Sequence, residues 1–217
     1  HIVDLGCGVA SSLCYIESQV SVSGLGVTLS EKQCKLANRR IKKQGYSDKL
    51  QCIQGDFCRL PKDLQQADLA FAIESFVHAQ SAGAFFHQAS TLVKPGGFLV
   101  ICDDFLADEA LLQDKEAAHW LDRFREGWLV NSLLSHEQVK KHATKTGFKK
   151  VESQNLTPYL EIKRPRDYFI SLLVRVLNKV SLKNSYLQML YGGDALQKCL
   201  SKKWVNYELK VWQRIND

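Results

Sequence analysis

The sequence predicts one α/β domain in which seven strands form a mostly parallel sheet with helices on both faces. Two observations predict this fold class. Apolar segments of strand length alternate with amphipathic segments of helical length, which is the pattern of a parallel sheet. The first apolar segment also ends at the closely spaced Gly6 and Gly8. A glycine turn at the carboxyl end of a buried strand lets a ligand approach the backbone.

The first half of the chain contains five strand-like and three helix-like segments. In chain order we expect them at His1–Leu5, Ala10–Gln19, Val20–Thr28, Ser30–Gln44, Leu50–Gln54, Ala67–Glu74, Gly83–Val93 and Phe98–Asp103. Ser30 is the expected N-cap of the second helix, with Gln33 as its capping-box partner, and Gly45 stops that helix. The turn Pro95-Gly96-Gly97 leads the chain into the fifth strand.

The second half carries longer helical segments. We expect its elements at Asp108–Trp128, Ser135–Thr146, Phe148–Leu156, Asp167–Val180, Tyr186–Leu200 and Trp204–Arg214. Gly147 ends the second of these segments and Pro165 opens the fourth, while apolar alternation makes the last one a strand. Residues 157–203 are therefore a helical insertion before the last strand, and such insertions commonly form the wall or lid of a ligand pocket.

Charge is unevenly distributed along the chain. Residues 1–137 carry a net charge of −4 and residues 138–217 a net charge of +10. A basic C-terminal third can attract an anionic substrate, a membrane surface or RNA. The basic residues are scattered, however, with few aromatic residues among them, so we expect a solvated lysine face and no nucleic-acid partner.

Seven cysteines are spread over the chain without paired metal-ligand spacing. This usage indicates reduced thiols in a cytoplasmic protein and predicts no metal site. No apolar run approaches the ~20 residues of a membrane span. The chain starts directly at its first strand, so we expect that upstream residues are absent from this sequence.

Five motifs occur in order along the chain. They are Asp4-Leu5-Gly6-Cys7-Gly8, Gly26-Val27-Thr28-Leu29-Ser30-Glu31-Lys32-Gln33, Gln54-Gly55-Asp56-Phe57, Glu74-Ser75-Phe76-Val77-His78 and Lys94-Pro95-Gly96-Gly97-Phe98-Leu99-Val100-Ile101. Together they resemble the class I S-adenosylmethionine (SAM) methyltransferases, in particular the subgroup that methylates carbon or oxygen of small molecules. The resemblance implies a Rossmann-like fold with an antiparallel seventh strand, SAM as cofactor and S-adenosylhomocysteine as product. It also implies upstream helices that cover the active site.

The same resemblance implies which residues contact the cofactor. Those residues are Asp4, Gly6, Cys7, Gly8, Thr28, Leu29, Gln33, Asp56, Phe57 and Glu74. Asp4 would order the loop or meet the ammonium group of SAM through water, or else cap its own turn. Thr28 and Gln33 stand in for the usual ribose-binding acid, which predicts modest affinity for SAM. Asp56 would accept from the adenine amino group, and Phe57 would pack on the ring or belong to the core.

The catalytic candidates are Glu74, His78, Asp103 and Asp104. If the nucleophile is a hydroxyl group, His78 is the expected general base and one of the two aspartates would orient it or bind the acceptor. If the nucleophile is an alkene carbon, methylation leaves a carbocation. Glu74 and aromatic faces would then stabilise that cation, and the aromatic candidates are Phe76, Trp120, Trp128 and Tyr159. Glu74 could instead hold the turn after the fourth strand.

The predicted function is transfer of a methyl group from SAM to a hydroxyl oxygen of a small lipophilic molecule, such as a terpenoid, a polyketide or a similar secondary metabolite. The first alternative is C-methylation of an alkene or a prenyl diphosphate, which the basic C-terminal third would suit. The second is a non-catalytic binding or scaffold protein with this fold. An NAD enzyme is disfavoured because Ser11 and Thr28 stand where the dinucleotide fingerprint needs a glycine and an acid. The acceptor is the expected partner, and a homodimer is a candidate assembly.

Overall fold

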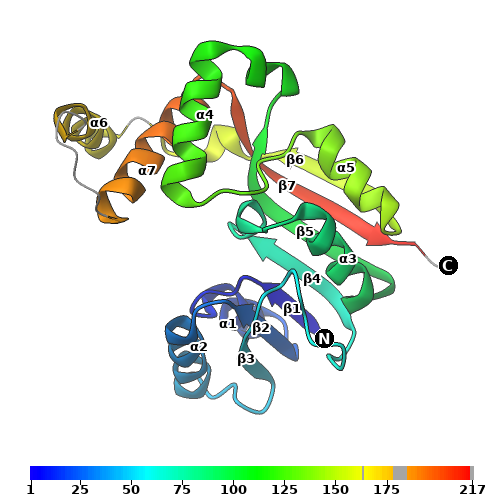
Figure 1. The fold of residues 1–217 in the computed structure, drawn as a ribbon. Coiled ribbons are helices and arrows are strands. Elements are labelled where there is room, and N and C mark those ends of the chain that lie inside the picture. Colours follow the sequence, from blue (N-terminus) through cyan, green and yellow to red (C-terminus); the bar gives the residue numbers. More distant parts are fainter. Residues whose placement is uncertain (163, 178–184, 216–217) are drawn as a thin grey trace.

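The computed structural model describes residues 1–162, 164–177 and 185–215, and Figure 1 shows their arrangement. Seven strands form one sheet in the order β3-β2-β1-β4-β5-β7-β6. Their bounds are Ile2–Leu5 (β1), Gly24–Thr28 (β2), Leu50–Gln54 (β3), Ala67–Ile73 (β4), Val93–Leu106 (β5), Phe148–Asn155 (β6) and Val205–Arg214 (β7). All neighbouring strands pair in parallel except β7, which is antiparallel to both β5 and β6. The predicted fold class is confirmed, including the antiparallel strand beside the fifth.

Helices cover both faces of this sheet. Their bounds are Ser11–Gln19 (α1), Glu31–Lys43 (α2), Ala82–Leu92 (α3), Lys115–Trp128 (α4), His136–Lys145 (α5), Pro165–Leu177 (α6) and Ser185–Ser201 (α7). Figure 1 shows α1 and α2 beside β1–β3, and α3 and α5 beside β4–β7. On the first face Leu13 and Ile41 belong to one core cluster with Leu50 of β3. On the opposite face Phe86 and Val139 join Trp212 of β7 in the largest core cluster.

One part of the sheet keeps an apolar face half-exposed. In the register of β4, β5 and β7, side chains two residues apart share a face. On the face that also holds α1 and α2, Ile73 is 40% exposed and Phe98 is 37% exposed. Val100 and Val211 beside them are only half-buried.

The helices α4, α6 and α7 form a separate layer, drawn in Figure 1 at the upper left, away from α1–α3. These helices come from the segments after β5 and after β6, where the sequence predicted helical segments, and the described residues confirm that both segments are helical. The α4 and α7 helices touch at two glycines. A Cβ atom added to Gly127 would lie 2.4 Å from the Cα atom of Gly192, so neither position leaves room for a side chain.

Three predicted elements have clearly different bounds in the structure. The second strand begins at Gly24, not Val20, because the N–H of Val20 bonds to the carbonyl of Ile16 and closes α1. The fifth strand runs from Val93 to Leu106, so it begins before the predicted Pro95-Gly96-Gly97 turn and continues beyond Asp103. It begins early because Val93 already pairs with Ala67 of β4. The segment Asp108–Trp128 is interrupted at Asp114, whose side chain accepts from the N–H of Ala117 and starts α4. The helix predicted to end at Val180 is described as far as Leu177, and its last residues lie outside the described chain.

Candidate active site

A cavity of about 380 Å³ lies where β4 and β5 end, beside α4 and α7. We call it the polar chamber. All four predicted catalytic residues, Glu74, His78, Asp103 and Asp104, line it. The walls also include Trp128 of α4 and Tyr207 of β7. A parallel sheet collects the carboxyl ends of its strands at one edge, which is why residues so far apart in the sequence meet here.

Asp103 and Asp104 are consecutive residues of β5 and both are buried. Asp103 accepts two backbone hydrogen bonds, from the N–H of Val77 at 3.1 Å and from the N–H of Asp104 at 2.9 Å. Burial raises the pKa of Asp103 to about 6. Because both of its oxygens accept backbone bonds, Asp103 positions the turn after β4.

Asp104 differs from its neighbour because no hydrogen bond to its side chain is found within the described residues. Burial, followed by the charges of Asp103 and Glu74, raises the pKa of Asp104 to about 8. A carboxyl group with such a pKa exchanges its proton near neutral pH, which is the property of a general acid or base.

His78 is an exposed residue of the short 3₁₀ helix Phe76–His78. Its Nδ1 lies 3.3 Å from the carbonyl oxygen of Leu129, directly after α4. A carbonyl can only accept, so in the neutral ring Nδ1 carries the hydrogen and Nε2 keeps its lone pair. The imidazole therefore has one nitrogen available to take a proton.

Glu74 occupies a strained backbone position, with a φ of 52°. Its N–H bonds to the carbonyl of Cys102 at 2.9 Å, which ties the end of β4 to β5. The hydroxyl of Tyr207 donates to Oε1 of Glu74 at 3.3 Å. A left-handed non-glycine residue costs about 1–3 kcal/mol and is found most often at functional sites.

Tyr207 is the functional candidate that the sequence did not reveal. It stands directly opposite Asp104 in the β5–β7 register, so the two side chains share a face. The sequence predicted the last strand but not its register, and register decides which residue faces Asp104.

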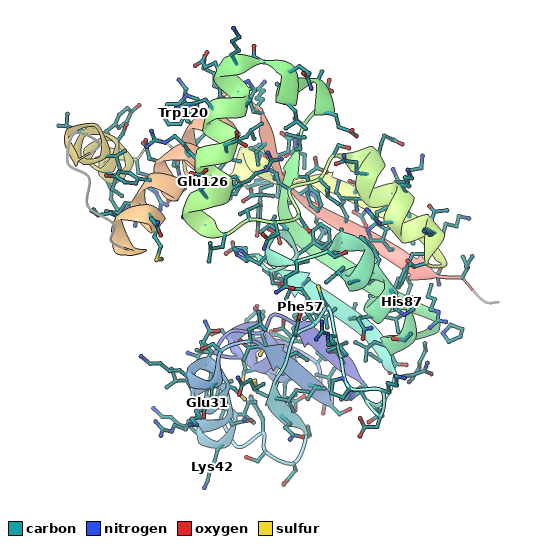
Figure 2. All side chains as sticks on the ribbon, viewed as in Figure 1. Glu31, Lys42, Phe57, His87, Trp120 and Glu126 are labelled. Carbon is teal, nitrogen blue, oxygen red and sulfur yellow. The ribbon has the colours of Figure 1, made fainter. Side chains whose placement is uncertain are left out.

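Of the aromatic residues proposed to stabilise a cation, only Trp128 lines the polar chamber. Phe76 is wrong for this role because it is fully buried, with its ring centroid 5.0 Å from that of Phe85. Trp120 packs beside Arg123 on α4, and Tyr159 is 76% exposed outside the chamber. Figure 2 shows Trp120 on α4, in a different part of the molecule from Phe57.

The two glycines of the first motif serve different purposes. Gly6 has a φ of 113°, and a Cβ added there would lie 2.3 Å from Cβ of Ser75, so Gly6 packs against the turn that follows Glu74. Gly8 has a φ of 53°, with no other atom within 4 Å of such a Cβ. Cys7 between them is buried, with its Sγ 3.4 Å from Sγ of Cys52 on β3. Only Gly8 thus leaves open space for a ligand beside the loop.

Asp4 is 3% exposed, and no hydrogen bond to its carboxyl group is found in the described part of the chain. It therefore does not cap its own turn, which was the alternative reading. Burial raises the pKa of Asp4 to about 7. A buried carboxyl group without a partner among the described residues, in the same motif as Gly8, fits a cationic ligand such as the ammonium group of SAM.

Thr28 and Gln33 bond to each other: the Thr28 hydroxyl donates to Oε1 of Gln33 at 2.9 Å. The capping box predicted for α2 is therefore half-formed. Ser30 accepts from the N–H of Gln33, while the Gln33 side chain turns to Thr28. Leu29 between them is 61% exposed.

In the motif after β3, Asp56 bonds to its own turn and Phe57 points into the core. Oδ1 of Asp56 accepts from the N–H of Cys58 at 2.8 Å, which closes its own turn. Phe57 is buried, and its ring meets that of Phe85 edge-on at 5.7 Å. Phe57 thus belongs to the core.

No helix among the described residues has the length and apolar character needed to cross a membrane. No group of three or more His, Cys, Asp or Glu side chains in those residues is arranged to hold a metal ion.

Residues 3–101 match the protein family described as Methyltransferase domain. An O-methyltransferase of Pyrenophora dematioidea is 29% identical over 74% of this chain and 58% of its own length. The 24-methylenesterol C-methyltransferase 2 of Arabidopsis thaliana is 26% identical over 71% of this chain and 43% of its own. The chain thus spans about half the length of these relatives.

Solved structures share the fold across almost the whole chain. Geranyl diphosphate C-methyltransferase from Streptomyces coelicolor superposes with a TM-score of 0.74 at 17% identity, covering 99% of this chain and 70% of that one. The [4+2]-cyclase SpnF superposes with a TM-score of 0.72 at 16% identity, covering 100% of this chain and 74% of that one. At these identities the likeness shows the fold alone.

Proposed function

We propose that this chain, which has the fold and the motifs of the class I SAM-dependent methyltransferases, transfers the methyl group of SAM to a hydroxyl oxygen of a small lipophilic molecule. The observation that carries the proposal is the polar chamber, which is lined by His78 and Asp104. The glycine loop packs directly against Ser75, the residue after Glu74, so cofactor and acceptor would meet at the end of β4. S-adenosylhomocysteine would be the second product.

SAM supplies an electrophilic methyl group when bound, and the protein must hold the acceptor oxygen in line with it. Asp4 is proposed to face the ammonium group, with open space for the cofactor at Gly8. Thr28, Leu29, Gln33 and Asp56 would contact the nucleoside part of SAM, with Phe57 supporting this region from the core. Nε2 of His78 would take the proton of the acceptor hydroxyl, because its Nδ1 is held by the carbonyl of Leu129.

The helical insertion 157–203 is proposed to wall the acceptor site. Leu160, Ile162, Leu196 and Leu200 from this insertion line the polar chamber. A lining that combines the apolar side chains of this insertion with the ionisable groups of β4 and β5 suits a lipophilic molecule with one polar reacting group.

Calorimetric titration with SAM and S-adenosylhomocysteine, with NADH as a control ligand, tests the cofactor. The wild-type chain is expected to bind both adenosyl compounds with micromolar affinity and not to bind NADH. Gly8→Arg should abolish binding by filling the open space. Gly45→Arg is the matched control, because Gly45 has a φ of 78°, also lies in open space and ends α2 far from the loop. Equal loss in both variants would argue against a cofactor site at Gly8.

Carbon methylation is the second candidate. Glu74 with its Tyr207 hydrogen bond, together with the Trp128 ring, could stabilise a carbocation in the same chamber. With turnover established on a given acceptor, His78→Ala should abolish O-methylation, and Glu74→Gln should abolish C-methylation. Tight SAM binding without turnover on hydroxylated or prenylated acceptors would favour a binding protein instead.

A further inference from the structure

A second cavity of about 290 Å³ adjoins the polar chamber. We call it the apolar groove, lined by Arg166, Ile170, Met189, Leu190 and Gly193 of α6 and α7. It shares three wall residues with the polar chamber, namely Trp128, Leu196 and Gln197. The two spaces therefore lie on either side of one partition.

Trp128 is one of the three shared wall residues, and its indole is held in place. Its Nε1 donates to the carbonyl of Met189 at 3.0 Å. A Cβ added to Gly192 would lie 2.4 Å from Cδ1 of the indole, so the ring occupies the space that this glycine leaves free. One hydrogen bond and one close packing contact thus fix Trp128 against α7.

Two further observations point to a ligand at this partition. Trp128 remains 39% exposed despite its contacts with α7, so part of its indole is open to a bound molecule. Oε1 of Gln197 is buried, yet it has no hydrogen-bond partner among the described residues. A buried acceptor atom without a partner is costly, and a donor on a bound molecule would relieve that cost.

We propose that Trp128 determines the maximum length of the acceptor by closing the polar chamber off from the apolar groove. The inference rests on the proposed function, because it takes the polar chamber as the acceptor site. The acceptor is then an amphiphile whose polar group reaches the carboxylates and whose apolar part ends at the indole. Removing the indole joins the two cavities, and the apolar residues of the groove then receive a longer tail.

The size of this effect follows from apolar burial. Each methylene group transferred from water into the groove is worth about fourfold in affinity. In the wild type the indole keeps four additional methylene groups out of the groove, so they add nothing to the affinity. In Trp128→Ala the same methylenes should enter the groove, and we expect at least a tenfold gain.

The test is calorimetric titration with 4-butylphenol and 4-octylphenol, which have the same polar end and differ only in tail length. The wild type is expected to bind the octyl compound no more tightly than the butyl compound. Trp128→Ala should bind the octyl compound at least tenfold more tightly. Trp120→Ala removes an indole from the same helix outside both cavities and should behave as the wild type.

Two further variants keep the test decisive. Gly193→Leu in the Trp128→Ala background should fill the groove and remove the gain, because Gly193 lines the groove. If Trp128→Ala does not fold, Trp128→Phe retains most of the packing and should show a smaller preference for octyl, about threefold. An octyl preference already present in the wild type, or unchanged in folded Trp128 variants, would overturn the inference. So would a failure of either phenol to bind.

Titration of the same proteins with SAM separates the two proposals. A shift in tail preference without SAM binding would leave the partition standing and refute the proposed function. SAM binding in every variant with no shift in preference would refute the partition alone.

Discussion

Asp4 shows how one residue can make cofactor binding depend on pH. Its pKa is raised to about 7 by burial, and the described chain gives it no hydrogen bond. Because the folded-state pKa lies above that of the unfolded chain, ionisation of Asp4 opposes folding. Its contribution to stability is therefore largest in acid and is lost as pH rises through about 7. A bound cation would reverse this preference, because it stabilises the ionised form.

We therefore predict that affinity for SAM rises by roughly tenfold between pH 6 and pH 8 and stays constant above pH 8. Calorimetric titration at several pH values measures this change. Asp4→Asn should weaken binding at pH 8 and flatten the profile, while Asp48→Asn, a charge removal in an exposed turn, should leave the profile unchanged. A steep profile that persists in Asp4→Asn would assign the titration to another group.

His136 is the second residue with a pH-dependent consequence. Its Nδ1 lies 3.3 Å from Nζ of the fully buried Lys210, and its Nε2 lies 3.4 Å from Nζ of Lys150. Burial, followed by the charges of these two lysines, lowers the pKa of His136. Lys210 is itself paired with Glu208, and its Nζ lies 4.3 Å from the Phe105 ring centroid.

Because the pKa of His136 is lowered in the folded chain, the unfolded chain takes up a proton at this residue more readily. The free energy of unfolding therefore falls as pH drops below about 6.5. His136→Gln should reduce the fall in melting temperature between pH 7.5 and 5.5, while His87→Gln on the exposed side of α3 should not. An identical fall in both variants would contradict the role of His136.

At the scale of elements, the contact between α4 and α7 depends on glycine. A Cβ on Gly127 would lie 2.4 Å from Cα of Gly192 and 2.7 Å from the carbonyl oxygen of Gln188, and backbone atoms cannot yield as a side chain can. A Cβ on Gly193, one residue further along α7, would lie 3.8 Å from the Trp128 ring, which is an ordinary contact.

Substitution by alanine at Gly127 and at Gly193 should therefore change the stability of the fold in opposite directions. Gly127→Ala should destabilise the fold by about 2 kcal/mol through overpacking. Gly193→Ala should stabilise it by up to about 1 kcal/mol, because alanine favours a helix more than glycine does. Denaturant unfolding of both variants checks this prediction, and a stabilising Gly127→Ala would show that the helices are not in close contact.

At the scale of the whole molecule, the sequence predicted what depends on local pattern. The carboxyl ends of the first three strands and the glycine loop followed from apolar runs and turn residues. The edge of the sheet at β4 and β5 brought together Glu74, His78, Asp103 and Asp104 as expected. Tyr207 was missed because antiparallel register is set by the whole sheet. Trp128 was named only as one of several aromatic residues, since helix packing, which places it at the chamber wall, has no local signature.

The half-exposed apolar face of β4, β5 and β7 has a consequence for how the protein behaves in a test tube. Ile73 and Phe98 present a patch that water wets poorly, and ammonium sulfate strengthens the tendency of such surfaces to leave water. The chain should be retained on a phenyl column at high salt and should bind anilinonaphthalene sulfonate with enhanced fluorescence. Ile73→Thr combined with Phe98→Thr should elute earlier and fluoresce less, whereas retention unchanged by both substitutions would point to another surface. Purification and storage of this chain thus favour low concentrations of salting-out ions.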